Sequence, residues 1–165
     1  MTYPVIALFT ICVFFVILLY DAWVRHKRIT NLNSLSVANG PPNTYPIKIQ
    51  RIKDGDTFVA DYIKLPWNSG LIDVTVRCFG YDAYESSKKR SKLITDQEIV
   101  LGKKAKLELE KLVKTNVFCY LKPEVPEFDC YGRILGRLYV PAEDGSFIDV
   151  AEHMISQNLV RNKGN

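Results

Sequence analysis

The chain has 165 residues, of which 47% are hydrophobic, 12% aromatic and 24% charged. This length suits one domain, and the composition supports a hydrophobic core and excludes a disordered or collagen-like chain. The 22 basic and 18 acidic residues give a formal charge of +4. From Tyr45 onward the chain has 19 basic and 17 acidic residues, so the two signs nearly balance there. No global field attracts polyanions, so nucleic-acid binding would depend on a local site.

The segment Tyr3–Tyr20 is an uncharged, strongly apolar run of 18 residues. A helix of that length can cross a hydrocarbon layer about 30 Å thick, so we expect a transmembrane helix within a membrane anchor of residues 1–28. A buried core helix is the other reading, but a run that is apolar on every face would have nothing to pack against in so small a protein. A cleaved signal peptide is the alternative, although no basic residue precedes the run and no small-residue cleavage pattern follows it.

Three basic residues follow the apolar run, namely Arg25, Lys27 and Arg28, and none precedes it. The positive-inside rule then predicts a single-pass protein whose C-terminal part is cytoplasmic, with the secreted or periplasmic side as the alternative. Residues 29–45 are rich in Asn, Ser, Pro and Gly without an apolar period, which predicts a flexible linker. The folded domain is therefore expected over residues 46–165.

Five segments of this domain alternate or are rich in β-branched and aromatic residues, which predicts strands. They are Ile47–Ile52, Thr57–Leu65, Leu71–Phe79, Val117–Lys122 and Ile134–Val140. A capping box at Thr95 and Glu98 predicts the start of a helix between the third and fourth strands, and Asp149 caps a last short helix, Val150–Gln157. This order predicts an α+β fold: a five-stranded OB-type β-barrel with two helices, preceded by the transmembrane helix.

Three short segments concentrate carboxylates and arginines next to glycines. They are Asp54-Gly55-Asp56-Thr57, the stretch from Arg77 to Glu85 with Asp82 between them, and Asp129-Cys130-Tyr131-Gly132-Arg133. Each segment alone is weak, because Asp-Gly turns are common in hairpins and exposed ion pairs are common on surfaces. Together, and in this order, they resemble the staphylococcal nuclease (thermonuclease-like) family over roughly Pro46–Val160.

The resemblance implies a Ca²⁺ cofactor and a hydrolytic role for this domain. It implies that Asp56, Asp82 and the backbone carbonyl of Ala83 ligate the cation, and oxygen ligands do suit a hard cation. It also implies that Glu85 activates or orients the attacking water.

The resemblance further implies two arginine clamps on the phosphate, Arg77 and Arg133, whose planar guanidinium groups match phosphate oxygens. In the third strand Arg77 alternates with apolar residues and should leave the core side. Further contacts to substrate are expected from Tyr131 and from a basic loop containing Lys88, Lys89 and Arg90.

The chain departs from the usual family pattern at several positions near these motifs. Ala83 replaces a common Thr, Tyr84 replaces a common Pro, and Cys130 replaces a Lys that meets substrate phosphate. Because the ligand at residue 83 would be a main-chain carbonyl, the change to alanine should leave the cation site intact.

The sequence thus predicts a membrane-anchored, Ca²⁺-dependent endonuclease acting on DNA, with RNA as a second candidate substrate and no obligate protein partner. The alternative is a non-catalytic module that binds single-stranded nucleic acid, as many OB barrels do by base stacking. The candidate stacking residues are Phe58, Tyr62, Tyr81, Tyr84 and Tyr131.

Overall fold

The structure is a computed structural model that describes residues 3–33, 39–66, 69–87, 94–114 and 118–162. Contacts within the chain divide it into two units, Met1–Leu35 and Ser36–Asn165.

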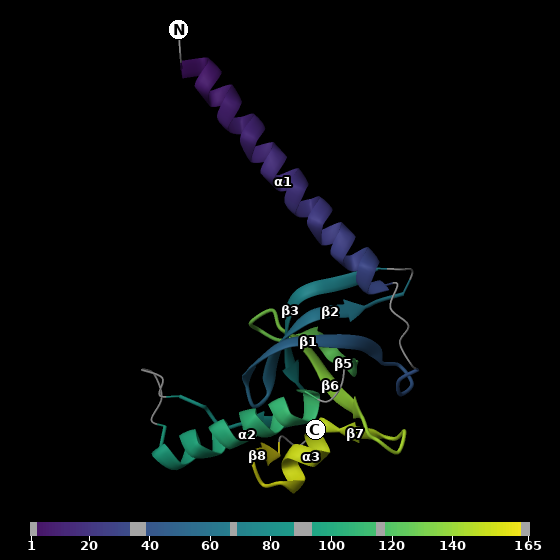
Figure 1. Cartoon of the computed structure of the whole chain (residues 1–165). Helices are drawn as coiled ribbons and strands as arrows, with labels where there is room; N and C mark the ends of the chain where they lie inside the picture. Colours follow the sequence, from purple (N-terminus) through teal and green to yellow (C-terminus); the bar gives the residue numbers. More distant parts are fainter. Residues whose placement is uncertain (1–2, 34–38, 67–68, 88–93, 115–117, 163–165) are drawn as a thin grey trace. The chain divides into compact units, whose positions relative to one another are not determined.

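The N-terminal unit is a single helix, α1 (Tyr3–Asn33), shown in purple and blue in Figure 1. Its second half contains two contacts between residues one turn apart. Asp21 and Arg25 form an ion pair at 2.8 Å, and Thr30 Oγ1 donates a hydrogen bond to the His26 carbonyl. The helix therefore continues into the segment expected to be a linker.

The predicted span Tyr3–Tyr20 lies partly outside the residues whose side chains are described, which begin at Thr10 in this helix. Within the described part of the chain, no helix combines the length and apolarity required to cross a membrane. The expected transmembrane helix is therefore not confirmed.

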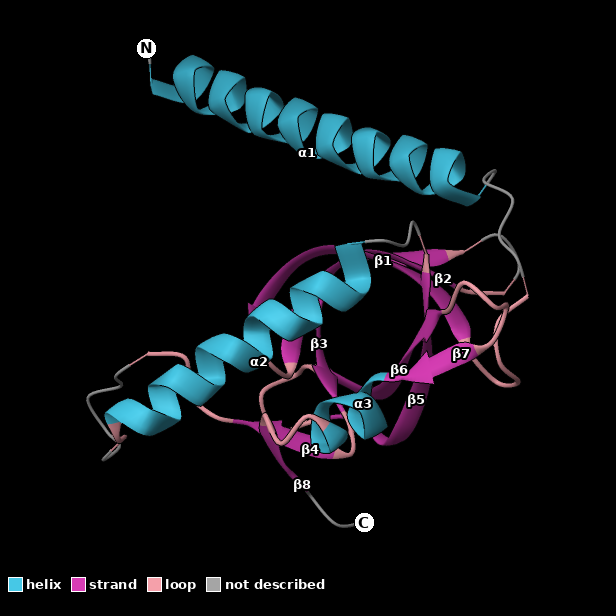
Figure 2. Ribbon diagram, turned by 60° about the horizontal axis from the view of Figure 1, so that its bottom comes forward, coloured by secondary structure: helices cyan, strands magenta, loops and turns pink. Residues whose placement is uncertain are grey.

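The C-terminal unit contains the predicted five-stranded barrel, and the α+β class is confirmed. Figure 2 shows the strands as a magenta ring, in which neighbours follow the order β3-β2-β1-β5-β6 and β3 pairs with β6 to close the circle. Only this closing pair is parallel among the barrel pairings of the described residues. The strands are β1 (Tyr45–Asp54), β2 (Thr57–Lys64), β3 (Gly70–Cys78), β5 (Cys119–Phe128) and β6 (Ile134–Pro141).

Two helices lie at one end of the barrel, α2 (Asp96–Lys114) and α3 (Val150–Ser156), as Figures 1 and 2 show. The capping box is confirmed, because Glu98 N–H donates to Thr95 Oγ1 at 3.2 Å and Thr95 N–H donates to Glu98 Oε2 at 3.1 Å. Asp149 caps α3 as predicted. Apolar faces of both helices close the core, and its fully buried members include Phe58, Tyr62, Val76, Leu109, Leu138 and Met154.

Three short strands were not predicted: β4 (Tyr81–Ala83), β7 (Phe147–Asp149) and β8 (Val160–Asn162). Each has three residues, too few to show an alternating pattern. β7 extends the sheet beside β6, and β4 pairs with β8 in a separate two-stranded sheet. β5 is also longer than expected, because it continues through Pro123 with an irregular register at the outer end of its hairpin with β6.

Candidate active site

The turn between β1 and β2, which carries Asp56, packs against α2 at Gly55. A Cβ at Gly55 would lie 2.7 Å from the Cβ of Ala105 and 2.9 Å from that of Ala83, so only glycine lets the turn approach the helix this closely. The Tyr81 hydroxyl donates to the Gly55 carbonyl at 2.9 Å, and Asp56 is only 5% exposed. The carboxylate therefore sits in a fixed, nearly buried position.

The two carboxylates predicted to bind the cation converge on one atom of Arg77. Its Nη2 atom lies 3.3 Å from Asp56 Oδ2 and also forms a short hydrogen bond with Asp82 Oδ1. The backbone N–H of Ala83 donates to Asp56 Oδ2 at 3.0 Å, which ties β4 to the β1–β2 turn. Asp56 and Asp82 are thus close enough to share one small cation.

Arg77 leaves the core side of β3 as predicted, between the buried side chains of Val76 and Cys78. Burial by itself would lower the pKa of the Arg77 guanidinium, but the charges of Asp56 and Asp82 outweigh it and the pKa is raised. The positive charge of Arg77 is therefore permanent.

Arg133 is held by its own hairpin loop. Asp129 Oδ1 accepts the backbone N–H groups of Tyr131 at 2.9 Å and Arg133 at 3.0 Å, and Asp129 Oδ2 accepts Arg133 Nε at 2.6 Å. Burial would raise the pKa of Asp129, but these hydrogen bonds and the Arg133 charge lower it. The Nη1 atom of Arg133 reaches Thr57 Oγ1 at 3.4 Å, so the guanidinium faces the start of β2.

Barrel closure brings the two arginines together, because Arg77 lies opposite Leu135 in the parallel pairing of β3 with β6. Both arginines line one open cavity of about 730 Å³. The predicted residues that line it are Asp56, Arg77, Asp82, Ala83, Glu85, Tyr131 and Arg133. The predicted contacts Lys88, Lys89 and Arg90 lie outside the described residues.

A close approach of α2 fixes the backbone beside Glu85. A Cβ at Gly102 would lie 2.5 Å from the Tyr84 carbonyl oxygen and 2.6 Å from the Glu85 carbonyl oxygen. The missing side chain of Gly102 therefore allows the helix to pack directly against the segment that carries Glu85. Ser86 adds a hydrogen bond to Asp54 at 2.6 Å, which connects this segment to the end of β1.

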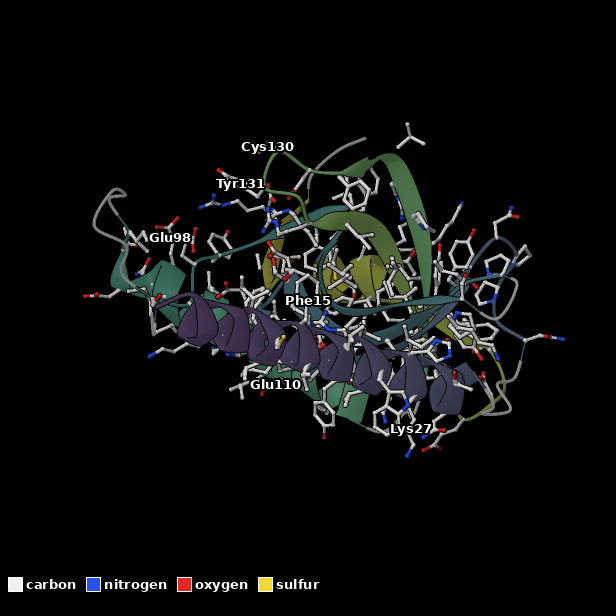
Figure 3. The ribbon with its side chains drawn as sticks, turned by 90° about the horizontal axis from the view of Figure 1, so that it is seen from above. Phe15, Lys27, Glu98, Glu110, Cys130 and Tyr131 are labelled. Atoms are coloured by element: carbon white, nitrogen blue, oxygen red, sulfur yellow. The ribbon has the colours of Figure 1, made fainter. Side chains whose placement is uncertain are left out.

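Sequence reasoning assigned no role to several residues that line the cavity. Glu98 and Arg161 line it beside Tyr84, and Figure 3 shows Glu98 on α2 and the neighbours Cys130 and Tyr131 on the loop after β5. A signal for Asp129 was present, since its spacing from Arg133 suits a local ion pair. Asp54 and Thr57 also line the cavity, although the first motif contained them without assigning them a role.

Three of the five aromatic residues considered for base stacking are buried, so that expectation was wrong for them. Phe58 and Tyr62 are completely buried in β2, and Tyr81 is 1% exposed. Tyr84 lines the cavity, and Tyr131 is 80% exposed with the Arg133 Cζ atom 5.3 Å from its ring centroid.

The donor set around Asp56 fits a hard cation of the Ca²⁺ type, since it consists of carboxylate oxygens that already share a positively charged neighbour. Among the described residues, no group of three or more His, Cys, Asp or Glu side chains gathers around one point. Two carboxylates would therefore need a backbone oxygen and water as further ligands.

Two comparisons with known proteins bear on this arrangement. The model of a family described as staphylococcal nuclease homologue matches residues 75–163, which is more than half of the chain. No curated protein matches the chain. The matched region contains Arg77, Asp82, Glu85 and Arg133, and Asp56 lies before it.

Proposed function

The chain belongs to the family of staphylococcal nuclease homologues, and on this premise we propose that it is a nuclease that hydrolyses phosphodiester bonds of DNA, with RNA as a second candidate substrate. One observation carries the proposal: the guanidinium groups of two arginines and the carboxylates of two aspartates, which come from four different parts of the chain, line a single cavity. They are Arg77, Arg133, Asp56 and Asp82. Surface ion pairs without a function would not need to converge in this way.

The two arginines supply the positive charge that phosphodiester cleavage requires. Negative charge accumulates on the phosphate oxygens in the transition state, and preorganised donors at those oxygens lower the barrier. Arg77 and Arg133 are held by carboxylates before substrate arrives, so little reorganisation is needed. Their planar groups can each donate two hydrogen bonds to a phosphate, which a lysine cannot reproduce.

We assign the cation site to Asp56, Asp82 and the carbonyl of Ala83. A bound Ca²⁺ would add positive charge beside the phosphate and favour a nucleophilic water. The near burial of Asp56 and its hydrogen bonds from Thr57 Oγ1 and Ala83 N–H support this assignment, because they keep the carboxylate oriented.

Glu85 is the proposed general base or water-orienting group. It lines the same cavity as both arginines, and α2 fixes its backbone through the close approach at Gly102. A positioned carboxylate that removes a proton from water contributes about 10²–10⁴-fold to a rate. Arg77 and Arg133 would then stabilise the charge that the attack creates.

The test is cleavage of single-stranded DNA by the purified full chain. We expect cleavage with Ca²⁺ and none with a chelator, and we expect Glu85→Gln to lose about 10²-fold or more while its circular dichroism stays that of the native protein. Full activity of Glu85→Gln would contradict the proposed role of Glu85. A complete lack of cleavage by the native chain with Ca²⁺ would reject the nuclease itself.

A non-catalytic module that binds single-stranded nucleic acid is the second candidate. The exposure of Tyr131 at the cavity favours it, since an exposed aromatic ring beside an arginine is a stacking platform. Such a module would bind DNA equally well with and without Ca²⁺ and would leave it intact, so the same cleavage assay separates the two functions.

We also propose that α1 attaches the protein to a membrane, with the nuclease domain on the cytoplasmic side. Apolar side chains of α1 from Phe14 to Tyr20 are 48–68% exposed, which is unusual for a helix in water. The full chain should stay in the membrane pellet after carbonate extraction, whereas a chain lacking residues 1–28 should not. Protease digestion of the domain from the non-cytoplasmic side of sealed vesicles would contradict the proposed side.

A further inference from the structure

The cavity has a second arginine-tyrosine pair that the proposed chemistry does not use. The Arg161 Cζ atom lies 4.5 Å from the ring centroid of Tyr84, and the Arg133 Cζ atom lies 5.3 Å from that of Tyr131. All four residues line the cavity. Proteins bind single-stranded nucleic acid through positive charges along the backbone and aromatic rings on which bases stack, with cation–π contributions from arginine.

Arg161 is placed by the pairing of β8 with β4. It lies opposite Asp82 in this antiparallel pair, and Val160 lies opposite Ala83. The strand that carries two of the three proposed cation ligands therefore also determines where Arg161 lies. The Arg161 side chain is 60% exposed, so a ligand in the cavity can reach it without a change in the backbone.

In the unliganded protein Arg161 has a carboxylate partner, Glu98. Arg161 Nη2 donates to Glu98 Oε1 at 2.5 Å, while the other oxygen, Glu98 Oε2, accepts Thr95 N–H and completes the cap of α2. Glu98 is thus a counterion that is anchored to its own helix. Because the ion pair is exposed, a competing phosphate can replace the carboxylate at little cost.

The size of the cavity leaves room for more than the scissile phosphate. Its volume is about 730 Å³, and cavities of roughly 300–1,000 Å³ accommodate ligands of drug size. One phosphate beside Arg77 and Arg133 would leave the side near Arg161 open to the next nucleotide.

We propose that Arg161, which contacts the Tyr84 ring, binds a second phosphate of the nucleic-acid strand next to the scissile one. Glu98 pairs with Arg161 until this phosphate replaces the carboxylate. This subsite deepens the proposed nuclease function and rests on it. Tyr84 serves as the platform that keeps the guanidinium flat against the cavity wall after it leaves Glu98. The site would therefore prefer a strand with several phosphates to a single diester.

The test measures binding of labelled thymidine oligonucleotides to the full chain, in a Glu85→Gln background with Ca²⁺ so that the probes remain intact. One probe has a single phosphodiester and the other has five. We expect Arg161→Ala to weaken binding of the longer probe roughly tenfold and that of the single diester less than twofold, since a hydrogen bond to a charged group is lost only with the longer probe. For the longer probe, the slope of the logarithm of the binding constant against the logarithm of the salt concentration should fall in magnitude by about 0.7, which is the value for one lost phosphate contact on a single strand.

Arg51→Ala is the matched control, because Arg51 is an exposed arginine on β1 that does not line the cavity. It removes the same charge and should change neither the affinity nor the salt slope by more than a small amount. Equal effects of Arg51→Ala and Arg161→Ala would show a general charge effect and overturn the subsite.

Glu98→Gln should change the affinity for the longer probe in the opposite direction to Arg161→Ala, and it distinguishes a binding role of Arg161 from a purely structural one. Glutamine can still serve in the capping box, but it no longer competes for Arg161, so the longer probe should bind more tightly. If Glu98→Gln weakens binding as Arg161→Ala does, the pair only holds β8 against α2 and the subsite is rejected. Failure of the nuclease function appears separately, as a lack of cleavage by the chain without the Glu85→Gln change.

Discussion

The two proposed phosphate clamps are held in place by different means. Arg133 depends on Asp129, four residues earlier in the same loop, through contacts to its Nε atom and its backbone N–H. Arg77 depends on Asp56 and Asp82, which come from another turn and another strand and are the proposed cation ligands. The position of Arg133 is thus set mainly within one hairpin, with one longer contact to Thr57 at 3.4 Å, whereas that of Arg77 is tied to the proposed cation site.

The largest expected effects come from removing either clamp. Arg77→Ala and Arg133→Ala should each reduce kcat by on the order of 10²–10³-fold, because each removes a preorganised charge from the transition state. Lysine at either position should not restore the rate. Single-turnover cleavage of DNA at saturating Ca²⁺ measures this loss.

The same two variants should differ in Ca²⁺ affinity, which provides the sharpest test of the comparison. Loss of Arg77 removes a positive charge next to Asp56 and Asp82 that opposes cation binding, so calorimetry should show tighter Ca²⁺ binding to Arg77→Ala. Arg133→Ala should bind Ca²⁺ as the native chain does. Identical Ca²⁺ affinities of the two variants would break the distinction between the clamps.

Gly102→Ala should lower kcat by on the order of 10²-fold, although alanine favours a helix over glycine by about 1 kcal/mol. The added Cβ would meet the carbonyl oxygens of Tyr84 and Glu85 at 2.5–2.6 Å and push the segment of the proposed base away from α2. Leu107→Ala, an exposed change on the same helix, is the control. Unchanged kcat with Gly102→Ala would show that the position of Glu85 does not depend on this contact.

Asp129→Asn should cause a smaller loss, roughly tenfold in kcat, because the amide oxygen still accepts backbone N–H groups while the charge opposite Arg133 is gone.

The folded-state pKa of Asp129 is lowered, so the stability that its charge contributes is present above the ordinary aspartate pKa of about 3.9. That contribution is lost only as the pH falls through the lower folded-state pKa. The difference in Tm between the native chain and Asp129→Asn should therefore be constant from neutral pH to about 5 and shrink below about 4. A constant difference down to pH 2 would contradict this origin.

The smallest expected effect is on stability alone. Tyr81→Phe removes the hydroxyl that donates to the Gly55 carbonyl and should cost about 1 kcal/mol of unfolding free energy. Urea denaturation measures this loss, and the cleavage rate at low temperature should change less than twofold. A large loss of activity without a loss of stability would show that this bond orients Asp56 more directly than we infer.

Much of the barrel and of the site could be predicted because its signals are local in sequence. The capping box at Thr95 and Glu98 involves neighbours within one turn, and the alternation along β3 placed Arg77 outside the core. The family motifs selected Asp82, Glu85 and Arg133, and the structure places these three residues around one cavity; their proposed roles stay predictions. The cap and the strand needed only residues a few positions apart, whereas the site residues needed three separate motifs in a fixed order along the chain.

The parts that were missed depend on contacts between distant segments. Arg161 reaches Tyr84 and Glu98 only because β8 pairs with β4, and three-residue strands give no periodic signal. Glu98 was recognised as a capping residue, but its second partner lies 63 residues away in the chain. Burial of Phe58 and Tyr81 likewise depends on barrel closure, which the aromatic residue type does not reveal.

The parallel pairing of β3 with β6 has a consequence for the order of folding. It joins Arg77 to Leu135 across a long stretch of chain, whereas the hairpins β1–β2 and β2–β3 form from neighbouring segments. Contacts of such high sequence separation are slow to form, since the closure entropy of the intervening chain opposes them. Recovery of cleavage activity during refolding should therefore not precede recovery of the strand signal in circular dichroism.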